Sequence, residues 1–247
     1  MPHPIAIAGI HSVRTALKHG SEGVSEVLLE CRRRDRRLAE VAELARNAGV
    51  PIRQVERDEL DRVAEGANHQ GVMAWVSTPA ARGENDLHKI LDHAEGLPFL
   101  LILDGVQDPH NLGACLRTAD AAGVHALIAP KDNAVGLTPV ACKVASGAAE
   151  TVPYVQVTNL ARTIDALKER GIWLIGTAGE ARSGLFETDL TGPAALVMGS
   201  EGKGLRRLTR ERCDLLVRLP MLGTVESLNV SVAAGICLYE ALRQRQP

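Results

Sequence analysis

Two segments rich in glycine and small polar residues follow two apolar runs near the end of the chain. GSEGKG (199–204) follows ALVMG (195–199), and PMLGTVESLNVS (220–231) follows LLVRLP (215–220). The apolar runs have the length and the aliphatic content of buried strands. Because open α/β sheets bind ligands beyond the carboxyl ends of their strands, we expect these two segments to form a ligand site. The glycines of the first segment would let backbone amides approach the ligand closely.

The first of these segments contains Gly-Lys, a dipeptide that also occurs in phosphate-binding P-loops. A P-loop requires Ser or Thr directly after the lysine and another Gly five residues before the Gly-Lys pair. This chain has Gly204 and Val197 at those positions. No G-x-G-x-x-G fingerprint follows the early strands either. The sequence therefore argues against a kinase, an ATPase and an ordinary dinucleotide-binding enzyme.

The elements that must position the site come from a regular alternation of strands and helices in residues 97–247. We expect strands at 99–104, 125–130, 152–157 and 172–177, and helices at 111–123, 138–150 and 159–171. Strands that alternate with helices of this length predict an α/β fold with a mostly parallel sheet and helices on both of its faces. The last helix is predicted to be amphipathic, with an apolar stripe formed by Val232, Ile236, Tyr239 and Leu242.

Residues 1–78 are predicted to form a separate small α/β domain. Its expected strands are 26–30, 52–55 and 71–76, and its expected helices are 12–20, 38–50 and 59–64. His11 and His69 belong to this domain, so we expect them to be structural or to contact a ligand rather than to be catalytic. Residues 79–96 start with Pro and carry mixed charge, which is typical of a linker with one short helix.

A cluster of five arginines lies between the second expected element and the helix that follows it. The cluster, RRRDRR, comprises Arg32, Arg33, Arg34, Arg36 and Arg37. One interpretation is a solvated helix start with Asp35 as the N-cap. The other is a phosphate-binding patch, because the guanidinium fork pairs well with phosphate oxygens. Residue types alone leave both interpretations open.

Composition describes an ordinary globular chain, with 45% hydrophobic and 23% charged residues. Aromatic residues make up 2%, which argues against RNA recognition by stacking bases on aromatic side chains. The formal net charge of -2 gives no global positive field, although a local basic patch could still bind RNA.

The five cysteines show neither C-x-x-C pairs nor zinc-like spacing with histidine, and no other metal cluster is apparent. We expect them to be buried apolar side chains in a reducing compartment. The start of the chain lacks the features of a signal peptide, and the longest apolar stretch, LPFLLIL (97–103), is too short to cross a bilayer. The sequence therefore predicts a cytoplasmic protein with no membrane partner.

Three longer segments contain the features described above: LDGVQDPHNLGACLRTADAAGV (103–124), LVMGSEGKGL (196–205) and LPMLGTVESLNVSVAAGICLYEAL (219–242). Together they resemble the three motifs of the SpoU/TrmH family, the RNA ribose 2′-O-methyltransferases of the SPOUT class. The resemblance runs from Leu100 to the end of the chain. IAGIHSVRTAL and GANHQGVMAWV, in the first domain, resemble the small RNA-binding domain of the longer family members.

The resemblance implies properties that residue spacing does not give. The C-terminal segment would thread a loop to form a deep trefoil knot that binds S-adenosylmethionine, although base rates alone argue against any knot. The family also implies a homodimer, with the site close to the subunit interface. End to end, the chain looks most like the members that methylate a guanosine in the P loop of 23S ribosomal RNA. The alternatives are a tRNA ribose 2′-O-methyltransferase and a non-catalytic rRNA-binding assembly factor.

The family's cofactor site implies that backbone around Gly199, Leu219 and Leu228 holds the adenosine part of S-adenosylmethionine. Met198 and Thr177, at the ends of expected strands, complete the cofactor-binding set. Without the resemblance, residues of these kinds would be ordinary tight-turn and core residues of a parallel sheet.

The reaction implied is an in-line displacement, in which a ribose 2′-hydroxyl attacks the sulfonium methyl group. The enzyme would align the reactants and assist loss of the hydroxyl proton. Arg117 is the family's position for a cation near this hydroxyl. Because a guanidinium with a pKa above about 12 is a reluctant base, we expect Arg117 to stabilise the alkoxide or position a phosphate. Judged alone, Arg117 would be an exposed arginine in the middle of a helix.

Four further residues complete the expected catalytic set. Asn111 would orient the ribose or Arg117 from one helical face, or would cap its helix. Glu201 would orient Arg117 or the ribose, whereas its alternative role is that of a solvated loop carboxylate. Ser227 and Asn229 match active-site positions of the family, although capping of the last helix would explain them as well.

Overall fold

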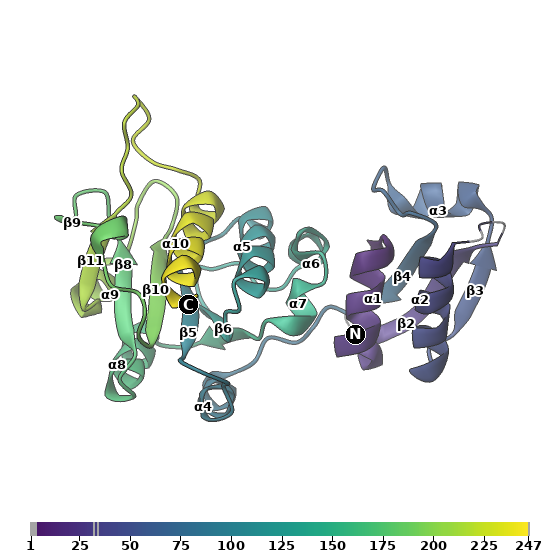
Figure 1. Cartoon of the computed structure of the whole chain (residues 1–247), viewed down its shortest axis with the longest axis horizontal. Coiled ribbons are helices and arrows are strands. Elements are labelled where there is room, and N and C mark those ends of the chain that lie inside the picture. Colours follow the sequence, from purple (N-terminus) through teal and green to yellow (C-terminus); the bar gives the residue numbers. More distant parts are fainter. Residues whose placement is uncertain (1–3, 32, 34, 247) are drawn as a thin grey trace. The chain divides into compact units, whose positions relative to one another are not determined.

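A computed structural model of the chain describes residues 4–31, 33 and 35–246 (Figure 1). Contacts between residues divide the chain into two compact units. The first unit comprises the chain up to Ala80 together with Leu137–Thr151, and the second comprises Ala81–Gly136 with the chain from Val152 onward. Much of the expected linker, from residue 81 to residue 96, therefore belongs to the second unit.

The first unit is built on a four-stranded mixed sheet in the order β1-β4-β2-β3. Strand β4 is antiparallel to both β1 and β2, whereas β2 and β3 are parallel. The strands are β1 (Ile5–Ala8), β2 (Val24–Glu30), β3 (Ile52–Val55) and β4 (Val72–Val76), and the helices are α1 (Ile10–His19), α2 (Arg36–Asn47) and α3 (Arg57–Ala64), with a 3-10 turn at Ser21–Gly23.

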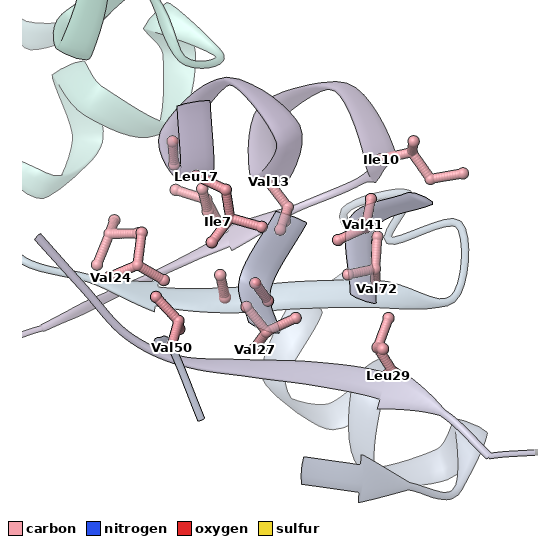
Figure 2. Packing of buried hydrophobic residues seen from close by; sticks show 14 of the residues in the cluster. Ile7, Ile10, Val13, Leu17, Val24, Val27, Leu29, Val41, Val50 and Val72 are labelled. Atoms are coloured by element: carbon pink, nitrogen blue, oxygen red, sulfur yellow. The ribbon is translucent and has the colours of Figure 1, made fainter. Parts of the chain in front are cut away.

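Side chains that alternate along the strands give this sheet two apolar faces. On one face, Val27 and Leu29 of β2 pack in one cluster with Val13 of α1 and Val41 of α2 (Figure 2). On the other face, Leu28 packs with Leu60 of α3. The expected small α/β domain is therefore a sheet covered by helices on both sides.

The turn before β4 is held by polar side chains. His69 is buried, and its Nδ1 accepts the N–H of Gly71 at 3.0 Å while its Nε2 lies 2.9 Å from Asp61 Oδ1. The Oε1 of Gln70 accepts the N–H of Ile10, the first residue of α1, at 3.2 Å. This geometry supports the structural interpretation of His69, whereas His11 is exposed on α1.

The arginine cluster is seen only in part, because Arg32 and Arg34 lie outside the described residues. Asp35 caps α2, and its Oδ1 accepts the N–H of Arg37 at 2.9 Å. The side-chain hydrogen bond from Arg37 also holds the pKa of Asp35 below its usual value of 3.8. The capping interpretation is therefore confirmed.

The second unit is built on a seven-stranded sheet in the order β7-β6-β5-β10-β8-β11-β9, and each adjacent pair is parallel. This confirms the predicted α/β fold with a mostly parallel sheet. The strands are β5 (Phe99–Asp104), β6 (Ala126–Pro130), β7 (Tyr154–Val157), β8 (Trp173–Thr177), β9 (Ser183–Gly184), β10 (Ala194–Gly199) and β11 (Leu215–Arg218).

Helices cover both faces of this sheet. Leu87 of α4 and Ile164 of α8 pack in one cluster with Leu100 and Val197 of the strands. Helix α10 packs against α5 and β10 (Figure 1) and covers the opposite face with α5. The helices are α4 (Glu84–Asp92), α5 (Pro109–Ala121), α8 (Leu160–Glu169), α9 (Arg207–Arg212) and α10 (Val230–Arg245), with a 3-10 turn at Leu185–Glu187.

Two details of the expected helices were wrong. The single helix expected at 138–150 is broken into α6 (Pro139–Ala145) and α7 (Ala148–Thr151), because Ser146 and Gly147 adopt positive φ angles of 54° and 100°. The second detail is the face of α10 that meets the core. Its buried residues are mostly small, namely Val230, Ala233, Ala234, Cys237, Leu238, Glu240 and Ala241. Within the predicted apolar stripe, Val232 and Tyr239 are each 51% exposed.

Three of the five cysteines are buried as expected, Cys115, Cys142 and Cys237, while Cys213 is partly buried and Cys31 is exposed. Burial raises the pKa of the Cys115 and Cys237 thiols to about 12. In the described part of the chain, no helix combines the length and the apolar character needed to cross a membrane.

The end of α10 anchors the chain that leads into β10. Glu240 accepts hydrogen bonds from Arg243 Nε at 2.9 Å and from Gln244 Nε2 at 2.8 Å. Gln244 also accepts the N–H of Leu190 at 2.8 Å and donates to the carbonyl of Thr188 at 3.0 Å. The hydrogen bonds from Arg243 and Gln244 lower the pKa of Glu240 from 4.5 to about 2.

We predict that Glu240→Gln lowers the Tm at about pH 7 by about 2–4 °C, the shift that a loss of about 1 kcal/mol produces in a chain of this size. A lowered carboxyl pKa stabilises the folded state above the unfolded pKa, and that stabilisation is lost as the pH falls toward the folded pKa. The difference between variant and wild type should therefore shrink below about pH 4.5. Thermal unfolding followed by circular dichroism at several pH values measures this difference in Tm. The control is Glu211→Gln, which removes an exposed carboxylate from α9; a pH-independent difference would contradict the assignment.

Candidate active site

The polar segments singled out in the sequence meet at one edge of the seven-stranded sheet. Strands β5 and β10 pair so that Leu103 lies opposite Met198 and Asp104 lies opposite Gly199. Strand β8 runs parallel on the other side of β10. From β5 the strand order continues in one direction to β6 and β7 and in the other to β10. The segments therefore lie at a topological switch point, where open sheets bind ligands.

The loop after β10 is closed by its own backbone. The N–H of Ser200 donates to the carbonyl of Gly204 at 3.1 Å, and the N–H of Gly204 donates to the carbonyl of Ser200 at 2.9 Å. A Cβ atom on Gly199 would lie 2.1 Å from the carbonyl carbon of Gly204 and 2.3 Å from the nitrogen of Leu205. Because the obstacle is backbone, only glycine fits at position 199.

A buried carboxylate fixes the end of this loop. Asp104, the last residue of β5, is fully buried, and its Oδ2 accepts the N–H of Arg206 at 2.9 Å. Its Oδ1 accepts a hydrogen bond from Arg206 Nε at 2.5 Å, and Arg206 Nη2 lies 2.5 Å from the same oxygen. The guanidinium thus compensates the buried charge, and one side chain holds both the backbone and the side chain of Arg206.

Three predicted catalytic residues form a hydrogen-bonded network. Asn111 Nδ2 donates to Glu201 Oε1 at 2.5 Å, and Asn229 Nδ2 donates to Asn111 Oδ1 at 2.9 Å and to Glu201 Oε1 at 3.2 Å. Asn111 is buried in the first turn of α5. The capping alternative for Asn111 was wrong, because Asp108 is the N-cap and accepts the N–H of His110 at 2.9 Å.

Asn229 serves the network and caps a helix at the same time. Its Oδ1 accepts the N–H of Ser231 at 2.9 Å and the hydroxyl of Ser231 at 2.6 Å, while its amide nitrogen faces Asn111 and Glu201. The capping interpretation of Asn229 is therefore confirmed, and its place in the active site stays a prediction. The cap fixes which edge of the amide points toward the network, so helix α10 orients part of the site.

A cavity of about 700 Å³ lies beside this network. The predicted cofactor-binding residues Gly199, Leu219, Leu228, Met198 and Thr177 all line it, together with Glu201, Ser227 and Asn229. Its volume is within the range of sites for drug-sized ligands. The walls combine aliphatic side chains with backbone of the glycine-rich loop, a combination that suits a ligand with a flat apolar ring and polar edges.

A second cavity of about 320 Å³ adjoins the same loop. Ser200, Glu201 and Lys203 line both cavities, so this part of the loop forms a shared wall. The remaining lining residues of the smaller cavity are Gly105, Val106, Gln107, Asp108 and Asn111. Two ligands bound on either side of Glu201 would meet at the carboxylate.

Arg117 is not brought into this arrangement. It lies six residues after Asn111 on α5, so the two side chains point about 120° apart around the helix. Arg117 is exposed, and it is not among the residues that line either cavity. The expectation that Asn111 and Arg117 share one helical face was therefore wrong, and Asn111 instead contacts Glu201 and Asn229.

Several residues of the site were not singled out in the sequence. Asp104 and Arg206 fix the loop, while Gln107 and Lys203 line the smaller cavity. A carboxylate at the end of an otherwise apolar strand was the available signal for Asp104. Among the described residues, no group of three or more His, Cys, Asp or Glu side chains could hold a metal ion.

Comparison with known families assigns both parts of the chain. Residues 98–239 match the SpoU rRNA Methylase family, and residues 6–81 match the family described as RNA 2'-O ribose methyltransferase substrate binding. The first match alone spans more than half of the chain and contains the network and both cavities. The second contains the four-stranded sheet and its helices.

Individual proteins match over nearly their full length. The chain is 56% identical over 241 residues to a protein of Pseudomonas aeruginosa named 23S rRNA (guanosine-2'-O-)-methyltransferase RlmB, covering 98% of this chain and 97% of that one. It is 58% identical to the Shewanella oneidensis protein of the same name, with 97% of each chain covered. Among solved structures, the SpoU methyltransferase AviRb of Streptomyces viridochromogenes, in complex with AdoMet, matches with a TM-score of 0.76 and 29% identity, covering 98% of this chain and 91% of that one.

We predict that Asp104→Asn loosens the loop after β10. The neutral amide keeps the size of the side chain but loses the ion pair with Arg206, which should cost about 1–3 kcal/mol of stability. Hydrogen exchange at the Ser200 and Gly204 amides should become faster than in the wild type. Glu211→Gln, which also removes one negative charge, should leave both amides unchanged. Equal protection in Asp104→Asn and the wild type would show that the loop is held by its backbone alone.

Proposed function

This chain belongs to the SpoU rRNA methylase family, and from this membership we propose that it transfers a methyl group from S-adenosylmethionine to the ribose 2′-hydroxyl of a guanosine in 23S ribosomal RNA. The observation that carries the proposal is the Asn111–Glu201–Asn229 network, which lies between two cavities that share Glu201 as a wall. One cavity would hold the methyl donor, and the other would hold the nucleotide.

The larger cavity fits S-adenosylmethionine by its shape and its chemistry. Gly199 and the loop after it would present backbone at close range to the adenosine, since a side chain at position 199 has no room. Leu219, Leu228 and Met198 would pack against the adenine ring, and Thr177 lies at the end of β8 beside them. AdoMet is bound in the related AviRb structure, which supports the same assignment here.

S-adenosylmethionine supplies a methyl group already activated on a sulfonium. The protein therefore needs mainly to align the ribose hydroxyl and assist the loss of its proton. Glu201 is suited to orient the hydroxyl, because its Oε1 is fixed by two amide donors while its Oε2 has no donor among the described residues. Asn111 and Asn229 would hold that carboxylate in place, and Ser227 would contact the reactants from the edge of the larger cavity.

Arg117 would act beside the site of a neighbouring subunit or on a phosphate of the RNA. We propose a homodimer in which the exposed apolar side chains of α10, Val232 and Tyr239, are covered by a second copy. The support is the face that this helix exposes, because its small residues pack on the core while these large apolar side chains face outward. Because α5 packs beside α10, the interface would bring Arg117 close to the partner subunit.

We also propose that the C-terminal segment forms a deep trefoil knot. After β11, near the far edge of the sheet, the chain returns as α10 to pack against β10 and α5 at its centre. A return of this kind, past the closed loop at Ser200–Gly204, is the path that a threaded chain would take. A crystal structure with bound S-adenosylmethionine would test the threading, the occupant of the larger cavity and the dimer together.

The two family matches support separate roles for the two parts of the chain. We propose that residues 1–78 bind the RNA substrate, that residues 97–247 form the methyltransferase domain and that residues 79–96 connect them. The finer proposal for the substrate is a guanosine in the P loop of 23S RNA, modified in the cytoplasm. A tRNA substrate is less well supported, because the relatives that match over nearly their full length are named for 23S rRNA.

We predict that the purified protein transfers label from methyl-labelled S-adenosylmethionine to one guanosine ribose of unmodified 23S RNA and not to transfer RNA. Arg117→Ala should lower the rate by about 10²–10³-fold, the usual cost of removing a group that stabilises developing negative charge. Arg162→Ala, which removes an exposed arginine from α8, is the matched control and should retain the wild-type rate.

The other outcomes of this experiment separate the rival functions. Label only in transfer RNA would keep the fold and the reaction but overturn the substrate. Tight binding of 23S RNA without any transfer of label would favour a non-catalytic assembly factor. Full activity in Arg117→Ala would remove Arg117 from the catalytic set while leaving the reaction intact.

We predict that Tyr239→Glu disrupts the dimer. A carboxylate placed in an apolar interface must be desolvated without a partner, so the dimer dissociation constant should rise at least about tenfold. Multi-angle light scattering over a dilution series measures the change. Trp173→Glu, which alters an exposed aromatic residue of β8, should not affect it. A wild-type protein that is monomeric throughout would contradict the proposed interface.

A further inference from the structure

The first unit contains a cavity of about 500 Å³ within the residues that match the substrate-binding family. It lies at the carboxyl end of β2 and the start of α2. Leu29, Leu38 and Ala42 supply an apolar wall, and Glu30, Arg33 and Arg36 supply charged groups. A wall of this kind with charged groups at its margin suits a planar aromatic ligand that has polar edges and an attached anion.

Glu30 is the most informative residue of this cavity. Its Oε2 is buried, and it accepts no hydrogen bond from the residues that the structure describes. The nearest described cation is Arg33, whose Nη1 lies 4.0 Å away, beyond hydrogen-bond distance. A buried acceptor without a donor costs free energy, so a ligand that donates a hydrogen bond to Glu30 would recover that cost on binding.

The position of Glu30 is fixed by the turn before β4. The N–H of Glu30 donates to the carbonyl of Gly71 at 2.9 Å. Gly71 has a φ of +86°, and a Cβ there would lie 2.9 Å from Arg33 Cδ, 3.0 Å from Glu30 Oε2 and 3.1 Å from Leu38 Cδ1. Side-chain atoms of Glu30, Arg33 and Leu38 therefore occupy the space beside Gly71, and all three residues also line the cavity.

The arginines at the margin supply positive charge for an anion. The side chain of Arg36 is 94% exposed, and that of Arg33 is 35% exposed. Asp35 lies between them, but it is already engaged as the N-cap of α2 and in a hydrogen bond with the Arg37 guanidinium. Arg36 is therefore free to move toward a phosphate, since its contact with Glu40 is a distant one at 3.7 Å on an exposed surface.

We propose that this cavity binds one unpaired guanine of the RNA substrate. Guanine presents two adjacent donors, N1–H and the N2 amino group, which a single carboxylate accepts together. The Watson–Crick edge of adenine or cytosine has an acceptor next to its amino group, and that of uracil has one N–H between two carbonyls. Single-stranded RNA is read by such contacts to splayed bases, and Arg33 and Arg36 would contact the adjoining phosphates. The inference rests on the proposed function for its RNA partner and extends it to a second, non-catalytic contact.

The first test is the methylation rate of unmodified 23S RNA at varied RNA concentration. Glu30→Gln keeps the size of the side chain but loses the charge and one acceptor, so KM for RNA should rise about tenfold. The kcat and the affinity for S-adenosylmethionine should stay unchanged. Glu43→Gln, on the exposed side of α2, is the matched control. An unchanged KM in Glu30→Gln, or a fall in kcat alone, would overturn the proposal.

The second test does not depend on methyl transfer. Guanosine 5′-monophosphate titrated into the full chain should shift the amide resonances of Gly71 and Leu38, and adenosine 5′-monophosphate should not. Glu30→Gln should abolish these shifts. Arg36→Ala should weaken them, whereas Arg46→Ala, at the other end of α2, should not. Equal shifts with both nucleotides, or no shifts with either, would overturn the assignment.

The two proposals can fail separately. A wild-type protein that transfers no methyl group to 23S RNA, but shows the guanine-dependent shifts, would overturn the proposed function and keep the cavity assignment. Methyl transfer with the expected specificity, together with no effect of Glu30→Gln, would keep the proposed function and overturn the cavity assignment.

Discussion

The site depends on how closely two pieces of backbone approach each other at the end of β10. Gly199 lies against the carbonyl carbon of Gly204, at a distance that leaves no room for a side chain. This contact folds the six-residue loop back on itself, and Asp104 then fixes its far end through Arg206. The loop closed in this way contributes Ser200, Glu201 and Lys203 to the walls of both cavities, so Glu201 lies where the two cavities adjoin. The geometry of the network follows from that boundary.

Much of this arrangement could be predicted from the sequence, because the signals were local. Apolar runs such as FLLILD (99–104) coincide with β5, and the order of strands and helices gave the parallel sheet. The polar segments after β10 and β11 were expected to meet, since the carboxyl ends of parallel strands share one edge. Asp35 was one of the caps that residue type and position suggested, and it accepts the N–H of Arg37.

What could not be predicted was decided by contacts between distant residues. An apolar stripe of Val232, Ile236, Tyr239 and Leu242 was predicted for α10 from spacings of three and four residues. In the structure, small residues such as Ala234 and Ala241 face the sheet, which lets the helix pack closely and leaves Tyr239 outside. A shared helical face for Asn111 and Arg117 was inferred from their separation of six residues, yet the partners of Asn111 lie 90 and 118 residues away. No pattern within one segment encodes such a network.

Helix α10 contacts the Asn111–Glu201–Asn229 network at its start and the chain that leads into β10 at its end. Its first turn is capped by Asn229, which touches Glu201, and its last turn holds the chain at Thr188 and Leu190 that leads into β10. Since proteins are synthesised from the N-terminus, this helix is the final part of the described chain to emerge. The first unit and the strands of the sheet are made earlier, but the network lacks Asn229 until the start of α10 has been made. The order of synthesis therefore leaves the Asn111–Glu201–Asn229 network incomplete until the strands of the sheet have all been made.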